Sequence, residues 1–192
     1  MAVLPFCPVK KKKKSKKYKQ LGDATSLIVS YQYRKFFKIN NNRVKVYSYK
    51  KTKNILEKNG KEWKCYKKDD IPALAKFLKV DAILYGTLLM ARKKNESDVF
   101  DYVMDTQDAA LSETVRVKIK FKIRDKSGNL IALKKVDSHY KGSLISNKID
   151  QALSSEIFKN VKVKDKYKIY FSEIFGAATK FYNWLWNEGF ND

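Results

Sequence analysis

Residues 115–123 alternate strictly between apolar and basic side chains. The period of two predicts a β-strand with one buried face and one solvent face. The turn sequence Asp125-Lys-Ser-Gly128 follows, and residues 130–140 are expected to return as the antiparallel partner. Such a hairpin needs a cover for its apolar face, which the rest of the chain must supply. The apolar positions of the alternation are Val115, Val117, Ile119, Phe121 and Ile123.

Helical periodicity precedes this hairpin. Residues 21–38 place apolar side chains at spacings of three and four and end in lysines, which predicts an amphipathic helix whose basic end complements the helix dipole. A short helix is predicted over residues 52–59, with Thr52 as its N-cap. Another short helix is predicted to follow a cap at Asp69 or Asp70.

Four further segments have the character of strands. Residues 2–6 form an apolar run that prolines are expected to end, and residues 80–90 predict a central strand covered on both faces. Residues 44–49 alternate, and residues 63–66 are a further short candidate. The interleaving of strands and helices predicts a mixed β-sheet with packed helices.

We therefore expect an α/β (α+β) fold, extended by two C-terminal helices over residues 145–159 and 167–186. A chain of 192 residues, 44% of them hydrophobic, is of a size to form one domain with one core. Residues 1–143 are predicted to form the mixed-sheet core, and residues 144–192 a helical segment packed on it. No apolar run approaches the roughly 20 residues that cross a bilayer, so no spanning helix is expected.

Basic residues dominate the charge. The chain has 42 Lys and Arg against 20 Asp and Glu, a formal net charge of +22. This field favours contact with nucleic acid, anionic lipid or acidic proteins. Lysine outnumbers arginine heavily, and a lysine excess is also what codon bias in an AT-rich genome produces, so both interpretations stay open.

Two groups of lysines are candidates for polyanion contact. The first is a tract that we expect to be a solvated loop, and the second is the solvent row of the predicted hairpin. Lysines on such a row can equally serve to keep a sheet edge soluble. The candidates are Lys10, Lys11, Lys12, Lys13, Lys14, Lys16, Lys17, Lys118, Lys120 and Lys122.

The last predicted helix has more aromatic side chains than one core face requires. It is either surrounded by core or presents aromatic side chains to a partner, and core packing is the interpretation that we favour. The side chains proposed for partner contact are Tyr170, Phe171, Phe181, Trp184 and Trp186.

No pattern of catalytic or cofactor-binding residues is found. The single histidine, His139, has no ligand partner at a useful spacing, and no phosphate-binding glycine motif occurs. Cys7 and Cys65 can form one disulfide or lie as small buried hydrophobic residues, and we expect the second. The sequence therefore predicts a binding protein that is not an enzyme and carries no metal or cofactor.

One segment has a more specific likeness. The sequence from Ile71 to Thr87, IPALAKFLKVDAILYGT, predicts a helix followed by Asp-Ala, two hydrophobic residues, and Gly before Thr. It resembles a sequence motif shared by the CsgG-like family of bacterial envelope lipoproteins, by TolB amino-terminal domains and by related small periplasmic lipoproteins. The opening strand and the closing hairpin resemble the same group in order, so the likeness extends over roughly residues 2–140.

This resemblance implies an anticodon-binding-domain-like fold used as an assembly or accessory module of the cell envelope. It implies a periplasmic or outer-membrane-associated lipoprotein, here without its leader, that binds a protein partner and has no catalytic residues. The alternative is a basic cytoplasmic module that binds nucleic acid through the candidate lysines. Anionic lipid is a further expected partner class, and the sequence does not indicate an oligomeric state.

Overall fold

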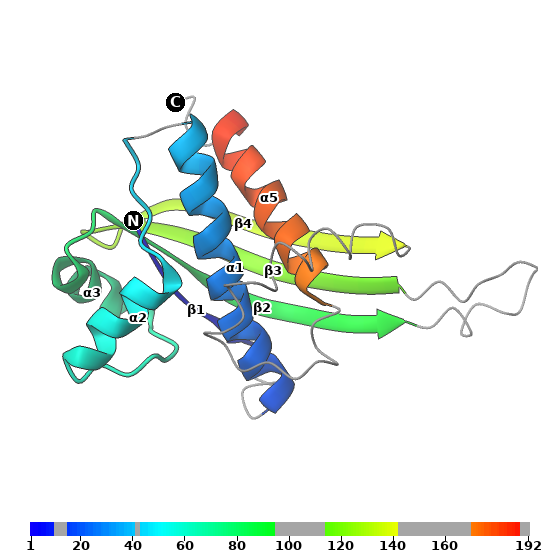
Figure 1. The fold of residues 1–192 in the computed structure, drawn as a ribbon, viewed down its shortest axis with the longest axis horizontal. Helices are drawn as coiled ribbons and strands as arrows, with labels where there is room; N and C mark the ends of the chain where they lie inside the picture. Colours follow the sequence, from blue (N-terminus) through cyan, green and yellow to red (C-terminus); the bar gives the residue numbers. More distant parts are fainter. Residues whose placement is uncertain (10–14, 41–42, 95–113, 142–169, 189–192) are drawn as a thin grey trace, which may run out of the picture.

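The computed structural model describes residues 1–9, 15–40, 43–94, 114–141 and 170–188 (Figure 1). Four strands form one mixed sheet in the order β1-β2-β3-β4. The strands are β1 (Ala2–Pro8), β2 (Ala82–Lys94), β3 (Thr114–Asp125) and β4 (Leu130–Lys141). β1 pairs parallel with β2, and the other two pairings are antiparallel. The predicted α+β class with a mixed sheet is confirmed.

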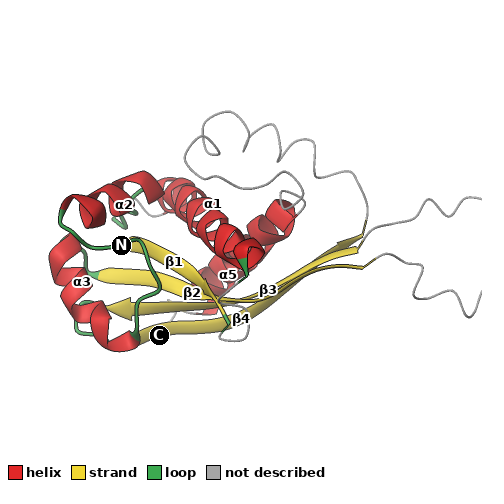
Figure 2. Ribbon diagram, turned by 90° about the horizontal axis from the view of Figure 1, so that it is seen from below, coloured by secondary structure: helices red, strands yellow, loops and turns green. Residues whose placement is uncertain are grey.

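Helices cover the sheet in two groups. The long helix α1 (Lys16–Asn40) and the C-terminal helix α5 (Phe171–Glu188) lie across one face, as Figure 2 shows edge-on. The shorter helices α2 (Tyr49–Lys58) and α3 (Ile71–Leu78) gather at the end of the sheet where β1 begins. A 3₁₀ turn, Lys68–Asp70, leads into α3. The second predicted C-terminal helix, residues 145–159, and the boundary at residue 143 lie outside the described residues.

The β3–β4 hairpin is confirmed, and its buried and solvent faces are those that the sequence predicts. Val117, Ile119 and Phe121 are fully buried, whereas Arg116 is exposed and Lys118 and Lys120 are partly exposed. At the turn, the Asp125 carboxylate accepts hydrogen bonds from the backbone N–H groups of Ser127 and Asn129, each at 2.8 Å. Gly128 follows with φ at 89°, a conformation that suits glycine.

The central position of β2 is also confirmed. Leu84 and Leu88 belong to the cluster under α1 and α5, whereas Ile83 and Tyr85 belong to the cluster formed with α2 and α3. Both faces of β2 are therefore covered over this stretch. β1 continues through its prolines to Pro8, which an edge strand allows because only one side of it needs N–H donors.

The two other strand predictions are wrong. Residues 44–48 form an extended segment that belongs to no strand, although the Tyr47 N–H donates to the Met1 carbonyl oxygen at 2.9 Å. This segment ends in Ser48, whose hydroxyl caps α2 by accepting from the Lys51 N–H at 3.1 Å. Thr52 therefore lies inside α2 and is buried. Residues 63–66 have no strand partner either.

Smaller differences affect the helix starts. Lys16 and Lys17 belong to the first turn of α1, where a loop was predicted, because the helix begins before its first large apolar residues. Asp70 precedes α3 but makes no side-chain cap to it; its carboxylate accepts from the Lys67 N–H at 2.7 Å instead.

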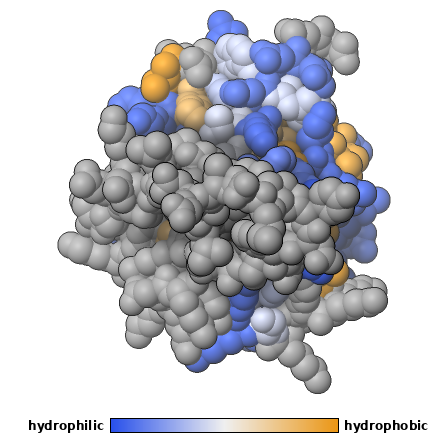
Figure 3. All heavy atoms as spheres, turned by 90° about the vertical axis from the view of Figure 1, so that its right-hand side faces the viewer, coloured by the Kyte–Doolittle hydropathy of each residue, from blue (hydrophilic) through white to orange (hydrophobic). Residues whose placement is uncertain are grey.

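None of the helices that the structure describes is long and apolar enough to cross a membrane. Among the described residues visible in Figure 3, hydrophobic patches are small and lie among hydrophilic residues.

We expect Gly86→Ala to lower the free energy of unfolding by roughly 3 kcal/mol. A Cβ at this position would meet the Lys120 carbonyl oxygen and the Phe6 ring at less than contact distance. Gly60→Ala is the control, because nothing lies within 4 Å of its Cβ position and only its φ of 68° is penalised, by about 1 kcal/mol. Urea denaturation measures both losses. Equal losses would show that β1 and β3 can move away from Gly86 at little cost.

Candidate functional site

The sheet carries a row of basic side chains on the face turned away from α1 and α5. Lys118, Lys120 and Lys122 alternate with the buried residues of β3 and therefore point away from the two helices. Register brings further cations beside them, because Arg92 of β2 pairs with Arg116 and Lys135 of β4 pairs with Lys120. α2 and α3 pack on this face at Ile83 and Tyr85, next to the Lys122 end of the row. We call the surface formed by Arg92, Arg116, Lys118, Lys120, Lys122 and Lys135 the basic face.

One carboxylate lies within the basic face. Asp137 accepts from the Arg116 Nε at 2.8 Å and lies 3.1 Å from the Lys118 ammonium. The hydrogen bond from Arg116 and the neighbouring Lys118 hold the pKa of Asp137 at about 2, against burial, which acts in the opposite direction. The positive charge of Arg116 and Lys118 is thus partly compensated within the protein.

The centre of the basic face has no such compensation. Lys120 and Lys135 lie directly opposite each other on neighbouring strands, and neither is in an ion pair among the residues that the structure describes. Like charges in this position oppose sheet pairing. Burial, and then the charges of Lys120 and Arg124, lower the pKa of Lys122. An anion bound here would relieve this repulsion, so the pair marks the part of the face best suited to an anionic ligand.

The lysines of the N-terminal tract are used differently. The Lys17 ammonium donates to the Ala91 carbonyl oxygen at 3.0 Å and to the Tyr170 hydroxyl at 2.7 Å. It thereby joins α1 to β2 and to the start of α5 and does not offer its charge to a ligand. Lys16 is exposed at the first turn of α1, away from the basic face. Lys10, Lys11, Lys12, Lys13 and Lys14 lie outside the described residues.

The aromatic side chains of α5 divide into two sets. Tyr170, Phe171 and Phe181 are buried in the main core, so they cannot contact a partner while the core is closed. Trp184 is half-buried, with the Lys134 ammonium 4.7 Å from its ring centre, and Trp186 is 42% exposed. Of the five proposed partner residues, only the two tryptophans reach the surface.

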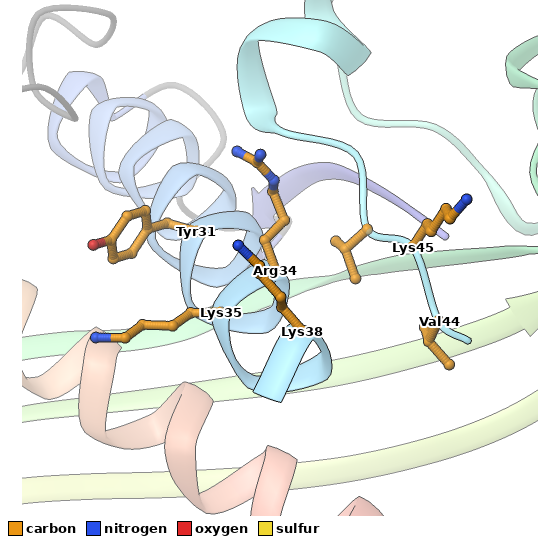
Figure 4. Close-up of a pocket in the computed structure, with 7 residues that line it drawn as sticks. Tyr31, Arg34, Lys35, Lys38, Val44 and Lys45 are labelled. Atoms are coloured by element: carbon orange, nitrogen blue, oxygen red, sulfur yellow. The ribbon is translucent and has the colours of Figure 1, made fainter. Parts of the chain in front are cut away.

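A shallow pocket between the end of α1 and residues 44–46 is also rich in cations. It is lined by Arg34, Lys35, Lys38 and Lys45, together with Tyr31 and two valines. Figure 4 shows these side chains pointing in different directions, so they do not converge on one ligand position. Cations at a helix C-terminus compensate the helix dipole, which accounts for those on α1.

A disulfide joins Cys7 at the end of β1 to Cys65 in the segment before α3, with their Cα atoms 5.7 Å apart. The expectation of two separate buried cysteines is therefore wrong. Trp63 brings the second cysteine into place: its indole N–H donates to the Asp23 carboxylate of α1 at 2.9 Å, and its ring packs against Tyr49. A link across 58 residues of sequence stabilises the fold by about 4 kcal/mol in the loop-entropy account. Sequence alone leaves this pairing open, because only tertiary packing brings the two residues together.

Asp23, the partner of Trp63, is a partly buried carboxyl group. Burial raises its pKa, and the hydrogen bond from Trp63 and the charge of Lys53 oppose this shift. Its indole partner and its position within α1 give it a structural role. Within the described parts of the chain, no group of three His, Cys, Asp or Glu side chains is placed to hold a metal ion.

Comparison with known proteins yields structural similarity only. No family model matches the chain, and no curated protein matches it in sequence. Lipoprotein GNA1162 from Neisseria meningitidis is similar in structure with a TM-score of 0.47 and 13% identity, over 83% of this chain and 94% of that one. The PelC dodecamer from Paraburkholderia phytofirmans gives a TM-score of 0.37 and 12% identity, over 92% of this chain and 83% of that one.

A minor lipoprotein from Acinetobacter baumannii gives a TM-score of 0.25 and 12% identity, over 71% of this chain and 80% of that one. The chain is thus structurally similar to bacterial lipoproteins. At these identities and TM-scores the similarity concerns the outline of the fold and implies nothing about function.

The Asp137 carboxylate should make stability depend on pH in the acidic range. Its pKa is lowered from 3.8 to about 2, so it stabilises the folded state above about pH 4, and this contribution is lost as the pH falls through 2. We expect Asp137→Asn to be less stable than the parent at pH 5, with the difference closing as the pH approaches 2. Denaturation curves across this range measure it. A carboxyl titration by NMR with a midpoint near 4 would contradict the ion pair with Arg116.

Proposed function

We propose that the chain is a non-enzymatic accessory or assembly protein of the cell envelope that acts outside the cytoplasm and binds an acidic protein partner on the basic face. The observation that carries the proposal is the disulfide between Cys7 and Cys65. A periplasmic or outer-membrane-associated lipoprotein is the specific form that the sequence resemblance implies.

The position of the disulfide supports a compartment outside the cytoplasm. Disulfides persist in oxidising compartments, whereas cytosolic thiols are kept reduced by glutathione and thioredoxin. Cys65 lies in an exposed segment, where small reductants can reach it. A disulfide at this position therefore favours the periplasm or the cell surface over the cytosol.

The composition of the basic face supports a protein partner. Four of its six cations are lysines, which act as point charges, and one of the two arginines already holds Asp137. Base recognition in nucleic acids relies mainly on the bidentate fork of arginine. A broad, lysine-rich surface suits the scattered carboxylates of an acidic protein, where complementary charge speeds association and fixes the orientation of the partner.

The second candidate is a cytoplasmic nucleic-acid-binding module. The row of cations along β3 favours it, because such a row can follow a phosphate backbone. The disulfide weighs against it, since the bond would not persist in a reducing cytosol.

We expect both cysteines to be blocked to alkylation in the native cells and to become reactive only after reduction. Cells quenched in acid, denatured and treated with a maleimide of high mass should show a gel shift in the reduced sample alone. Cell fractionation should place the protein with the envelope. Two free thiols in the untreated sample, with the protein in the cytosolic fraction, would reject the proposed location.

We expect Lys120→Glu/Lys135→Glu to weaken binding to an acidic polypeptide by about tenfold or more at low salt, because two attractive charges become repulsive. The control is Lys50→Glu/Lys58→Glu, which makes the same change of charge on exposed positions of α2. Polyglutamate and a single-stranded oligonucleotide serve as probes in a salt titration.

The two variants separate a local site from a general field. Equal losses in both would show that only net charge matters and would reject the basic face as the site. Binding of the oligonucleotide far tighter than of polyglutamate, with a steep salt dependence, would favour the second candidate. Lys120→Gln/Lys135→Gln should show an intermediate loss and guards against an effect of the new glutamates on folding.

A further inference from the structure

Two large apolar side chains remain exposed at the C-terminal ends of the helices that cover the sheet. Ile39 of α1 is 70% exposed and Trp186 of α5 is 42% exposed. Each side chain would gain favourable burial if a partner covered it.

Both helices run in the same direction. Lys17 and Tyr170 meet at their starts, and the Phe36 and Tyr182 rings are in contact near their ends, with their centroids 4.5 Å apart. Figure 1 shows both C-terminal ends at the same side of the molecule. The last turns of α1 and α5 are therefore neighbours.

Helical periodicity places Ile39 and Trp186 on the same side of the helix pair. Gln32 of α1 contacts α5 through the Phe175 carbonyl oxygen, at 3.2 Å, and through Thr179. Ile39 is seven residues after Gln32, and Trp186 is seven residues after Thr179. Seven residues are about two full turns, so each side chain lies on the same side of its helix as the contacting residue, about 10 Å further along. Phe36 is half-buried against Tyr182, on whose ring Trp186 stacks at 6.2 Å.

Basic residues border Ile39, whereas the last turn of α5 beside Trp186 holds the acidic Glu188, which lies 3.9 Å from the Lys134 ammonium. Lys35 and Lys38 lie one turn before and directly beside Ile39, and both are exposed, as is Arg34. No acidic side chain lines the adjoining pocket. We call the surface formed by Ile39, Trp186, Lys35 and Lys38 the helix tip.

We propose that the helix tip docks on the surface of an anionic phospholipid bilayer, with Ile39 and Trp186 entering the headgroup region and Lys35 and Lys38 contacting the lipid phosphates. Tryptophan is enriched at this depth, where its ring is apolar and its N–H can reach polar groups. Each lysine near an anionic leaflet adds attraction that falls off over a Debye length.

Other occupants fit the helix tip less well. A stable protein interface buries about 800 Å² on each partner, which two apolar side chains do not provide. A second copy would bring the same lysines together, on chains whose net charge is +22 each. A bilayer needs only a few inserted side chains and provides the opposite charge.

The docking would leave the basic face free. α1 and α5 cover one side of the sheet, and the basic face lies on the other. The proposal is independent of the acidic partner, and the two can fail separately.

Vesicle sedimentation of the whole chain, with the disulfide intact, tests the proposal. We expect binding to phosphatidylcholine vesicles that contain phosphatidylglycerol, and much weaker binding to phosphatidylcholine alone. Ile39→Ser/Trp186→Ser should lower the partition coefficient about tenfold or more, because both insertions are lost. Lys35→Gln/Lys38→Gln should reduce the preference for the anionic vesicles while leaving the weak binding to neutral ones unchanged.

A control removes equally exposed apolar surface elsewhere. Ile131→Ser/Leu133→Ser changes residues of β4 that are 48% and 40% exposed, and it should leave vesicle binding within twofold of the parent. Trp186→Phe should retain most of the binding but lose the blue shift in tryptophan emission that vesicles induce, since Trp63 and Trp184 remain as reporters away from the lipid.

Three results would overturn the proposal. They are no binding to anionic vesicles at low salt, binding that the Ile39 and Trp186 substitutions leave unchanged, or an equal loss in the β4 control. Unchanged urea denaturation of the exposed-residue variants would confirm that a loss of binding does not arise from unfolding.

Discussion

Phe121 is the contact on which both layers of the fold depend. Its ring meets Phe6 of β1 edge-to-face at 5.3 Å and stacks on Phe181 of α5 at 4.5 Å. The first contact crosses β2 above Gly86, where no side chain intervenes, and the second joins the sheet to its covering helix. Tyr33 of α1 also stacks on Phe181, with the ring centroids 6.4 Å apart, and brings the other helix into the same cluster. The cluster fixes which face of β3 is buried, and the lysines between these positions must then face outward.

The sequence predicts those elements whose periodicity is long and unbroken. The alternation in β3 and the apolar stripe of α1 identify their structures because one face of each is buried along its whole length. The segment at residues 44–48 alternates in the same way, yet it forms no ladder with β1. It hydrogen-bonds to Met1, just before β1, through the Tyr47 N–H and the Lys45 carbonyl oxygen. A short alternation does not reveal whether a partner strand is present. The sequence does not distinguish Ser48 from Thr52 as the cap of α2, because both residue types are favoured at this position. Only the structure shows that Thr52 lies one turn inside the helix and is buried.

The candidate site was predictable only in part, for a related reason. Lys118, Lys120 and Lys122 follow from the period of a single strand. The roles of Lys135 and Asp137 follow only from the register between β3 and β4. This register places Lys135 opposite Lys120 and makes Asp137 the counter-ion of Lys118. Lys17 and Trp63 act through contacts with residues distant in sequence, so the sequence around them does not indicate their roles.

The connectivity of the Cys7–Cys65 bond affects how the sheet is assembled. β1 must find a parallel partner, and Cys7 pairs with Thr87, so the chain has to close a long loop that contains α1, α2 and α3. Closing long loops is entropically costly and slows the formation of parallel pairs. Once the two sulfurs are joined, the shortest covalent path from β1 to β2 runs through Cys65 and α3, so the two strands are much closer along the chain. An oxidising environment would thus favour the correct pairing of β1 with β2 during folding, in addition to stabilising the folded chain.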